Sequence, residues 1–397
     1  MLDVLAFDAS VSIILVSLEF SYLHELMSFG SITSSVASID RVRAARNPGL
    51  DAVRTLAITL VLIAHFGEAA AWVSHVRLPK PISAAGYFGV EIFFALSGFL
   101  IGGILLRMLA EQPTASAWGV FMVRRWMRTL PVYFLWILVL CVVTPPPDGA
   151  RIVWIYTALL PNLAWAMIGG TWFPVAWSLM VEEWFYLLFS ASLLAIAAKR
   201  PRFAIPIILL LFLLSPLWAT VWFRLTGTTP QGTWDEAVRK IVIIRLDAIA
   251  YGVAVAWLQA GFPALLKRLR WIMFSCGVSI LLILWVNFFE DYEFTRWFRD
   301  SLYAPLTSLG CALCIPAAYH LKIKDSLIKS AVTWLSRRSY GLYIVHFSLI
   351  HLFGSTFYSQ GWSLQAAVAL SLIASLLIAE ASWRWFEQPI LRMRPRL

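Results

Sequence analysis

The sequence predicts an all-α polytopic membrane protein. Hydrophobic residues make up 60% of the 397 residues and charged residues only 14%, whereas about a quarter of the residues of a soluble domain are charged. Apolar stretches of about 18 residues or more recur along the chain, and each is long enough to cross the ~30 Å hydrocarbon core of a bilayer. The formal net charge of +10 is therefore interpreted as a signal of membrane orientation, and no nucleic-acid partner is expected.

We expect about ten transmembrane helices. Counted from a cytoplasmic N-terminus, the inner loops carry most of the lysines and arginines and the outer loops carry few, so both termini are predicted to lie in the cytoplasm. The ten predicted spans are residues 51–72, 86–107, 129–144, 176–198, 204–223, 239–259, 271–289, 300–320, 339–358 and 363–385.

One further apolar segment, residues 151–168, is predicted to re-enter the membrane or to lie on its surface. Pro161 and Asn162 interrupt it. The alternative is an eleventh span, which would place the basic segment 199–202 outside and invert every later loop. Irregular backbone at membrane depth must be buried in protein or line a cavity. The outer segment 145–175 is therefore a candidate vestibule for a substrate, with Trp154, Trp165 and Trp172 as its aromatic residues.

The two ends of the chain are predicted to lie outside the membrane domain, which we place at residues 47–390. Residues 1–46 are interpreted as a poorly specified extension, because Asp3 and Asp8 stand where a secretory signal would need basic residues. Residues 391–397 are predicted to form a basic cytoplasmic tail.

The cysteines do not suggest a metal site. Cys311 and Cys314 form a C-x-x-C pair, but no second pair and no flanking histidine accompany them. We interpret them as small membrane hydrophobes. The sequence also contains no metal-ligand spacing, glycine-rich phosphate loop or nucleophile elbow, so no metal is expected.

The first predicted span carries the first candidate site. Asp51 and Arg54 stand at its cytoplasmic start, and His65 lies deep in the apolar run. Arg54 and His65 are eleven residues apart, about three helical turns, so they share a face and are separated by ~16 Å along the axis. An ionisable residue inside a membrane span is costly, which makes it a functional candidate.

An arginine pair and a glutamate pair are further candidate site residues. Arg125 and Arg128 lie one turn apart before the third span, a spacing that suits either membrane anchoring or a bidentate grip on phosphate. Glu182 and Glu183 open the fourth span. Adjacent helical residues point ~100° apart, so one of the two faces the bundle interior squarely, and Glu182 is favoured.

Three more intramembrane charges need partners. Glu91 in the second span is either an ion-pair member or a site residue, and the nearby Ser97-Gly98 favours close helix packing. Arg245 and Asp247 in the sixth span are two residues apart. Within one helix they would lie on different faces, so each is expected to find a partner elsewhere.

The ninth predicted span carries a loose polar stripe. Tyr340, Tyr343 and His346 follow one another at three-residue spacing. A buried histidine can be structural or catalytic, and both interpretations stay open for His346. His351 lies nearer the outer end of the same span.

Taken in order, these residues resemble the membrane acyltransferase family 3 proteins of the bacterial O-acetyltransferase type. The resemblance runs from about residue 50 to residue 390, and it departs at Trp184, where a glutamine is common. Any one motif is weak, whereas six in the same order are specific. They are the pair Arg54 and His65, the LSGF run Leu96–Phe99, the R-x-x-R pair Arg125 and Arg128, the WSL-x-x-E-x-x-FYL pattern over Trp177–Leu187, the SY…LY…H stretch Ser339–His346, and the terminal E-x-P at Glu387 and Pro389.

The resemblance implies an enzyme of the bacterial inner membrane that moves an acyl group, usually acetyl, from acetyl-CoA to a hydroxyl of a carbohydrate or other acceptor. It implies that the CoA phosphates dock on Arg125 and Arg128, with Arg54 helping. His65 would then act as general base on the acceptor hydroxyl, or carry the acyl group briefly. Glu182 would orient His65 or stabilise its protonated form.

The acceptor is left open by the resemblance. Lipopolysaccharide O-antigen, exopolysaccharide, peptidoglycan, a periplasmic glucan and a small secreted molecule all fit. Since no hydrolase-like domain follows the last span, any second transfer step is expected to need another protein.

Two other classes fit the polar membrane interior. A transporter or flippase for a glycan or small solute also needs polar groups at mid-membrane and a re-entrant segment. A non-catalytic membrane sensor is the other alternative. We find no inverted repeat between the two halves of the sequence, and neither alternative needs an arginine group for CoA at the inner face.

Overall fold

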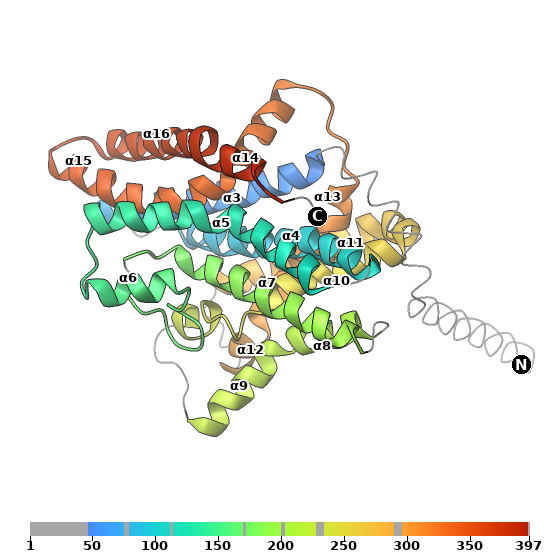
Figure 1. Cartoon of the computed structure of the whole chain (residues 1–397). Coiled ribbons are helices and arrows are strands. Elements are labelled where there is room, and N and C mark those ends of the chain that lie inside the picture. Colours follow the sequence, from blue (N-terminus) through green and yellow to red (C-terminus); the bar gives the residue numbers. More distant parts are fainter. Residues whose placement is uncertain are drawn as a thin grey trace, which may run out of the picture.

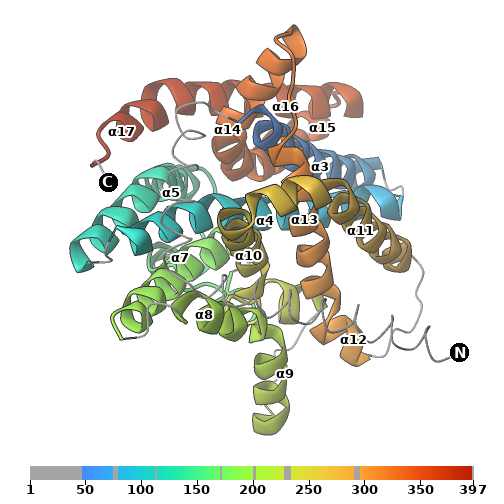
Figure 2. The same cartoon turned by 90° about the vertical axis from the view of Figure 1, so that its right-hand side faces the viewer.

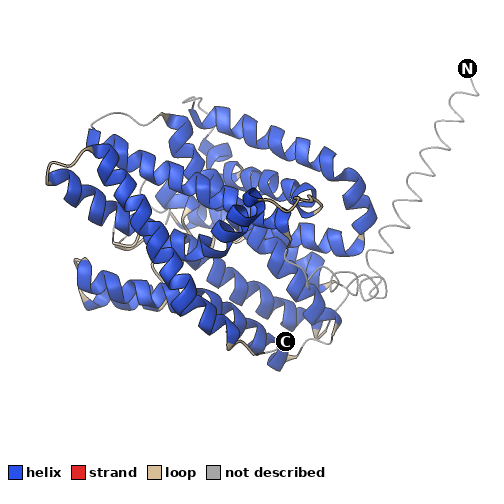
Figure 3. Cartoon of the chain, turned by 90° about the horizontal axis from the view of Figure 1, so that it is seen from above, coloured by secondary structure: helices blue, strands red, loops and turns tan. Residues whose placement is uncertain are grey.

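The structure is a computed structural model that describes residues 47–74, 79–111, 114–169, 172–199, 203–227, 234–289 and 296–395. The predicted extension at residues 1–46 and the last two residues of the predicted tail lie outside this part of the chain. The described part is helical and contains no β-strand (Figure 3). Its helices are α3 (Pro48–Ser74), α4 (Lys80–Ala110), α5 (Ala115–Val143), α6 (Ala150–Thr157), α7 (Ala176–Ala197), α8 (Ala204–Leu213), α9 (Ser215–Thr226), η1 (Asp235–Arg239), α10 (Asp247–Gly261), α11 (Pro263–Phe289), α12 (Arg296–Ser301), α13 (Tyr303–Tyr319), α14 (Leu327–Leu349), η2 (Ile350–Gly354), α15 (Ser355–Ser359), α16 (Leu364–Ser382), η3 (Trp383–Glu387) and α17 (Gln388–Arg392).

Several of these helices are long and apolar enough to cross a membrane. In the described part of the chain there are six, or seven if the bent pair α8 and α9 forms one span. The expected number of ten is not confirmed. One reason is that α10 has only 15 residues, which gives ~22 Å of helix against ~30 Å of hydrocarbon. The helix α13 is also short, with 17 residues.

The segment 151–168 does not form one long helix. Only α6, of eight residues, is helical, and turns follow it through Pro161. Trp172, expected in a vestibule, is instead buried, and its Nε1 donates to the Thr144 carbonyl oxygen at 2.7 Å. Trp154 stays largely exposed.

The helices α4 and α10 lie in the middle of the bundle (Figure 2). They approach closely because both carry glycine at the crossing. A Cβ atom on Gly98 would lie 1.9 Å from the Ile249 carbonyl oxygen, and one on Gly252 would lie 2.1 Å from the Ala95 carbonyl oxygen. The close packing expected for Gly98 is therefore confirmed.

Side-chain contacts give the directions in which the central helices run (Figure 1). Arg54 contacts Ser336 and His65 contacts His346, so α3 and α14 are parallel. On α5, Trp118 bonds to Ser190 and Thr129 to Glu183, so α5 and α7 are antiparallel. Thr129 and Trp136 of α5 bond to Tyr340 and Ser348 of α14, so these two helices are also parallel. The three parallel helices α3, α5 and α14 therefore begin at the same end of the bundle.

A buried ion network joins α4, α10 and α13. The Arg245 Nη2 donates to Glu91 Oε2 at 2.7 Å, and Arg245 Nε donates to Asp247 Oδ1 at 3.4 Å. Ser308 Oγ donates to the same Glu91 oxygen at 2.7 Å. All three charged side chains are fully buried. Glu91 is thus an ion-pair member in this structure.

The contact between Arg245 and Asp247 corrects an expectation. The sequence places both in one helix, where they would point to different faces. The structure starts α10 at Asp247 and leaves Arg245 in the preceding turn. The turn folds the guanidinium back onto its neighbour, so Arg245 contacts Asp247 as well as Glu91.

We predict that Gly98→Ala destabilises the protein. The new methyl group would meet the backbone of α10, and overpacking of this kind costs ~1–3 kcal/mol. The thermal midpoint of the purified protein in detergent should fall. Gly119→Ala on α5 is the matched control, because a Cβ there meets nothing within 4 Å. It should raise stability slightly, since alanine is the better helix former. Equal midpoints for both variants would contradict the close crossing.

We also predict that Glu91→Gln lowers the thermal midpoint. Breaking a buried ion pair from one side typically costs ~3–5 kcal/mol, because the remaining charge stays buried. Glu111→Gln, at the exposed end of the same helix, should have little effect. A Glu91→Gln protein with wild-type stability would show that this network does not stabilise the fold.

Candidate active site

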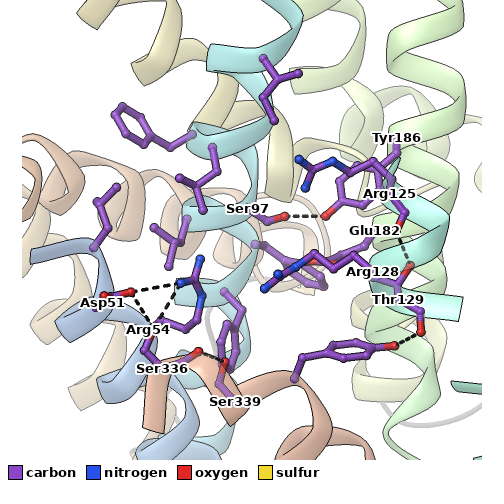
Figure 4. A pocket seen from close by; sticks show the side chains of 18 of the residues that line it. Asp51, Arg54, Ser97, Arg125, Arg128, Thr129, Glu182, Tyr186, Ser336 and Ser339 are labelled. Atoms are coloured by element: carbon purple, nitrogen blue, oxygen red, sulfur yellow. Dashed lines mark hydrogen bonds and ion pairs between the residues drawn. The ribbon is translucent and has the colours of Figure 1, made fainter. Parts of the chain in front are cut away.

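A cavity of about 520 Å³ lies where α3 begins and α4 ends. Its wall is apolar toward the interior and polar toward the end of the bundle. Figure 4 shows Asp51, Arg54 and Ser336 on one side of it, facing Arg125, Arg128 and Glu182 on the other. Residues far apart in sequence, from α3, α5, α7 and α14, therefore share one cavity.

The cavity is rich in positive charge. Six arginines line it against two carboxylates, Asp51 and Glu182, which leaves a formal excess of four positive charges. All six lie on the side that the sequence assigns to the cytoplasm. The arginines are Arg54, Arg107, Arg125, Arg128, Arg337 and Arg394.

Arg54 is held by a small polar cluster. Its Nη1 lies 3.5 Å from Asp51 Oδ1 and donates to Ser336 Oγ at 3.2 Å. The Ser336 hydroxyl in turn donates to Asp51 at 2.8 Å. The cluster fixes the guanidinium at the cavity wall and ties α3 to α14.

The opposite wall presents Arg125, Arg128 and Glu182. The Nε atom of Arg125 is buried and has no hydrogen-bond partner among the described residues. Glu182 lies beside Arg125 and Arg128 and beside the hydroxyls of Tyr186 and Ser97, which bond to each other at 2.6 Å. Glu182 therefore belongs to the arginine-lined cavity.

Glu183 and Tyr340 have a different surrounding. Thr129 Oγ1 donates to Glu183 Oε1 at 2.6 Å, and Tyr340 Oη donates to the Thr129 carbonyl oxygen at 2.6 Å. Glu183 is buried and does not line the cavity, whereas Tyr340 does. This chain of bonds links α7, α5 and α14 behind the site.

His65 meets a second histidine. Its Nδ1 lies 2.8 Å from Nε2 of His346, and the two ring planes are 15° apart, so the bond lies close to both ring planes. His346 is fully buried, and His65 is only partly so. The orienting contact that the sequence assigned to Glu182 is thus made by His346.

The hydrogen bonds assign the tautomers of this pair. His346 Nδ1 lies 3.0 Å from the Leu342 carbonyl oxygen, an acceptor only, so this nitrogen carries the hydrogen. In a neutral ring His346 Nε2 is then an acceptor, and His65 Nδ1 must donate to it. The lone pair of His65 is left on Nε2, where no described protein group is bonded to it. This is the arrangement of a general base held by a second group.

Tyr343 contacts both the cavity and the histidine pair. Tyr343 and Ser178 line the cavity, and their hydroxyls bond at 2.7 Å. The Tyr343 ring lies 5.8 Å from the His346 ring, centroid to centroid. His65 itself does not line the cavity.

Arg239 is a further charged residue near His65, and the sequence did not indicate it as a site residue. It lies near the start of α4, whereas the cavity residue Arg107 lies near the end of this helix. The Arg239 guanidinium sits 4.6 Å over the Trp177 ring and 5.2 Å over the Tyr87 ring. It also forms an ion pair with Asp235, which Lys240 shares. Arg239 and Lys240 are among the charges that act on His65.

Three of the cavity arginines were not predicted as site residues. Arg107, Arg337 and Arg394 each stand at a helix end or in a basic loop, where the sequence offers membrane orientation as a sufficient explanation. These three arginines lie at the same end of the helix bundle and line one cavity. This placement depends on how the helices pack, so the sequence does not reveal it.

The described residues contain no cluster of three or more histidine, cysteine, aspartate or glutamate side chains suited to a metal ion. All four cysteines are free thiols.

Comparison with known families gives one broad match. The model of a family described as "Acyltransferase domain" matches residues 47–382. This segment contains the ion network, the histidine pair and all cavity arginines except Arg394. No solved structure matches the chain.

Three named bacterial proteins are similar to this chain. "Peptidoglycan O-acetyltransferase OatA" of Listeria monocytogenes is 27% identical over 373 residues, which cover 86% of this chain and 55% of the relative. "Putative peptidoglycan O-acetyltransferase YrhL" of Bacillus subtilis is 26% identical over 366 residues, covering 86% and 54%. A relative from Staphylococcus aureus strain COL, named as a "Putative O-acetyltransferase", is 24% identical and covers 86% and 57%. The chain thus spans just over half the length of these relatives.

Proposed function

The chain belongs to the acyltransferase domain family, and we propose that it transfers an acyl group, by default acetyl, from cytoplasmic acyl-CoA to a hydroxyl of a carbohydrate of the cell envelope. The observation that carries this proposal is the position of an arginine-lined cavity next to a histidine pair with one free acceptor nitrogen. The names of the relatives support acetyl as the group and peptidoglycan as one acceptor to test.

The donor side is argued from charge. Each phosphomonoester carries about −1.5 to −2 charges at pH 7, and CoA carries a phosphomonoester and a diphosphate. A cavity with four excess positive charges suits such a ligand. Arg125 and Arg128, one turn apart, offer planar forks for bidentate contacts to phosphate oxygens. The Glu182 carboxylate acts electrostatically on both guanidiniums.

The chemistry is argued from the tautomer of His65. Its Nε2 takes the proton of the acceptor hydroxyl, and the oxygen attacks the thioester carbonyl carbon. The tetrahedral intermediate then breaks the carbon–sulfur bond, and the proton passes from His65 to the leaving CoA sulfur. The products are the O-acyl ester and free CoA. For this step the thioester end must pass Tyr343 and Ser178.

The membrane placement completes the proposal. We infer a multi-pass protein of the bacterial inner membrane, with about ten crossings and both termini in the cytoplasm. The parallel pair α3 and α14 and the antiparallel pair α5 and α7 support the alternating directions that this count requires. The acceptor then approaches from the end of α4 that carries Tyr87.

We predict that membranes with the wild-type protein move label from isotopically labelled acetyl-CoA into envelope carbohydrate. His65→Ala should lower the rate by ~10²–10⁴, the usual contribution of a general base. Acetyl-CoA binding should survive in this variant, because His65 does not line the cavity. Fractionation of the labelled envelope identifies the acceptor.

Two results would contradict this proposal. Full transfer by His65→Ala at wild-type abundance would remove His65 from the reaction. Absence of both label transfer and acetyl-CoA binding in the wild type, in cells that supply the acceptors, would favour the transporter class instead.

We predict that His346→Ala lowers kcat by about 10–100-fold, a typical cost of a misplaced catalytic group. Without the His346 acceptor, the His65 ring loses its fixed tautomer and orientation. The KM for acetyl-CoA should stay unchanged. His351→Ala, five residues further along the chain, is the matched control and should keep near wild-type kcat. A rise in KM at constant kcat would show that His346 acts in donor binding instead.

A further inference from the structure

The segment after the last long helix returns over the arginine-lined cavity. The helix α16 continues into η3 and α17, and both Trp383 and Arg394 from this segment line the cavity. Arg124 on α5 donates a hydrogen bond to the Pro395 carbonyl oxygen. The segment is therefore fastened to the same helix that carries Arg125 and Arg128.

Two nitrogen atoms of the Arg394 guanidinium have no protein partner in the described part of the chain. Its Nε and Nη2 atoms are buried and have no hydrogen-bond partner among the described residues. Burial, and after it the positive charges of three arginines, lower the pKa of the Arg394 guanidinium to about 9. The group stays charged at neutral pH. The three arginines are Arg128, Arg125 and Arg124.

This arrangement is unfavourable without a ligand. Arg394 as a residue is half-buried, but two buried guanidinium nitrogens without a hydrogen-bond partner still cost free energy, and like charges at short range add repulsion. Arg125 Nε is a second buried, unpartnered donor in the same cavity. An anion with several acceptor oxygens between Arg125 and Arg394 would offset both costs. A phosphate supplies such oxygens, and the guanidinium fork matches its geometry.

We propose that Arg394 completes a phosphate-binding site with Arg125 and Arg128, and that this site binds a phosphate of the acyl-CoA donor. The inference rests on the proposed function. The inference adds to that function a segment that lies beyond residue 382, where the match to the family model ends. The other source of the same chemistry is the phosphate of a lipid headgroup at the membrane surface.

The test measures acetyl-CoA binding by the full chain in lipid nanodiscs of phosphatidylcholine alone. Arg394→Gln should raise the Kd by about tenfold or more, the loss of one charge-assisted contact. Arg394→Lys should fall between wild type and Arg394→Gln, because it keeps the charge and loses the fork. Arg392→Gln is the matched control: Arg392 is exposed, two residues away, and should leave the Kd within about twofold.

The Kd of Arg128→Gln for acetyl-CoA is measured in parallel. It distinguishes failure of the proposed donor from failure of the role of Arg394. No acetyl-CoA binding by the wild type would overturn the proposed donor itself. A weakened Arg128→Gln beside an unchanged Arg394→Gln would overturn only the role of Arg394. An effect of Arg394→Gln on stability in phosphatidylglycerol nanodiscs, with an unchanged Kd for acetyl-CoA, would assign the phosphate to lipid. Failure of Arg394→Gln alone to fold would assign a structural role. Each of the last two results also overturns the proposal.

Discussion

The hydrogen bond between His65 and His346 depends on the register of two helices and in turn sets the chemistry of the site. It forms because α3 and α14 run parallel, with Arg54 against Ser336 at one end and His65 against His346 about three turns later. The Leu342 carbonyl fixes the proton on His346. That proton assigns the donor nitrogen of His65, so one contact determines both where the imidazole lies and which nitrogen can take a proton.

Charge is distributed unevenly over the bundle. In the middle, Arg245 is balanced by Glu91 and Asp247, and all three are buried. At the end of the bundle, the cavity arginines outnumber the carboxylates. The central network pairs its one cation with carboxylates of the protein, although Glu91 Oε1, Arg245 Nη1 and Asp247 Oδ2 have no hydrogen-bond partner among the described residues. The cavity, in contrast, holds more arginines than carboxylates. Like charges that gather without counter-charges repel one another, and this imbalance supports the proposal of an anionic ligand.

The regular geometry of a helix made the relative positions of some site residues predictable from the sequence. Arg54 and His65 both contact α14 because α3 is one continuous helix through both residues. Adjacent residues of a helix point ~100° apart about its axis, which separates the side chains of Glu182 and Glu183. The partner of His65 was not predictable, since it depends on the packing of α3 against a helix near the other end of the chain. The span count was also beyond the sequence, because apolar residues before α10 continue the hydrophobic run without forming helix.

The helix α14 shows why hydropathy alone misplaces function in such a protein. It has 23 residues, yet it is not among the helices apolar enough to count as spans. Its polar residues recur at spacings of three and four and form one face, which contacts Arg54 at one end and His65 at the other. The same polarity that weakens it as a membrane span lets it connect the arginine-lined cavity to the histidine pair. Its neighbours must then cover this face, and they are the helices that supply the other site residues. The residues of the face are Ser336, Ser339, Tyr340, Tyr343 and His346.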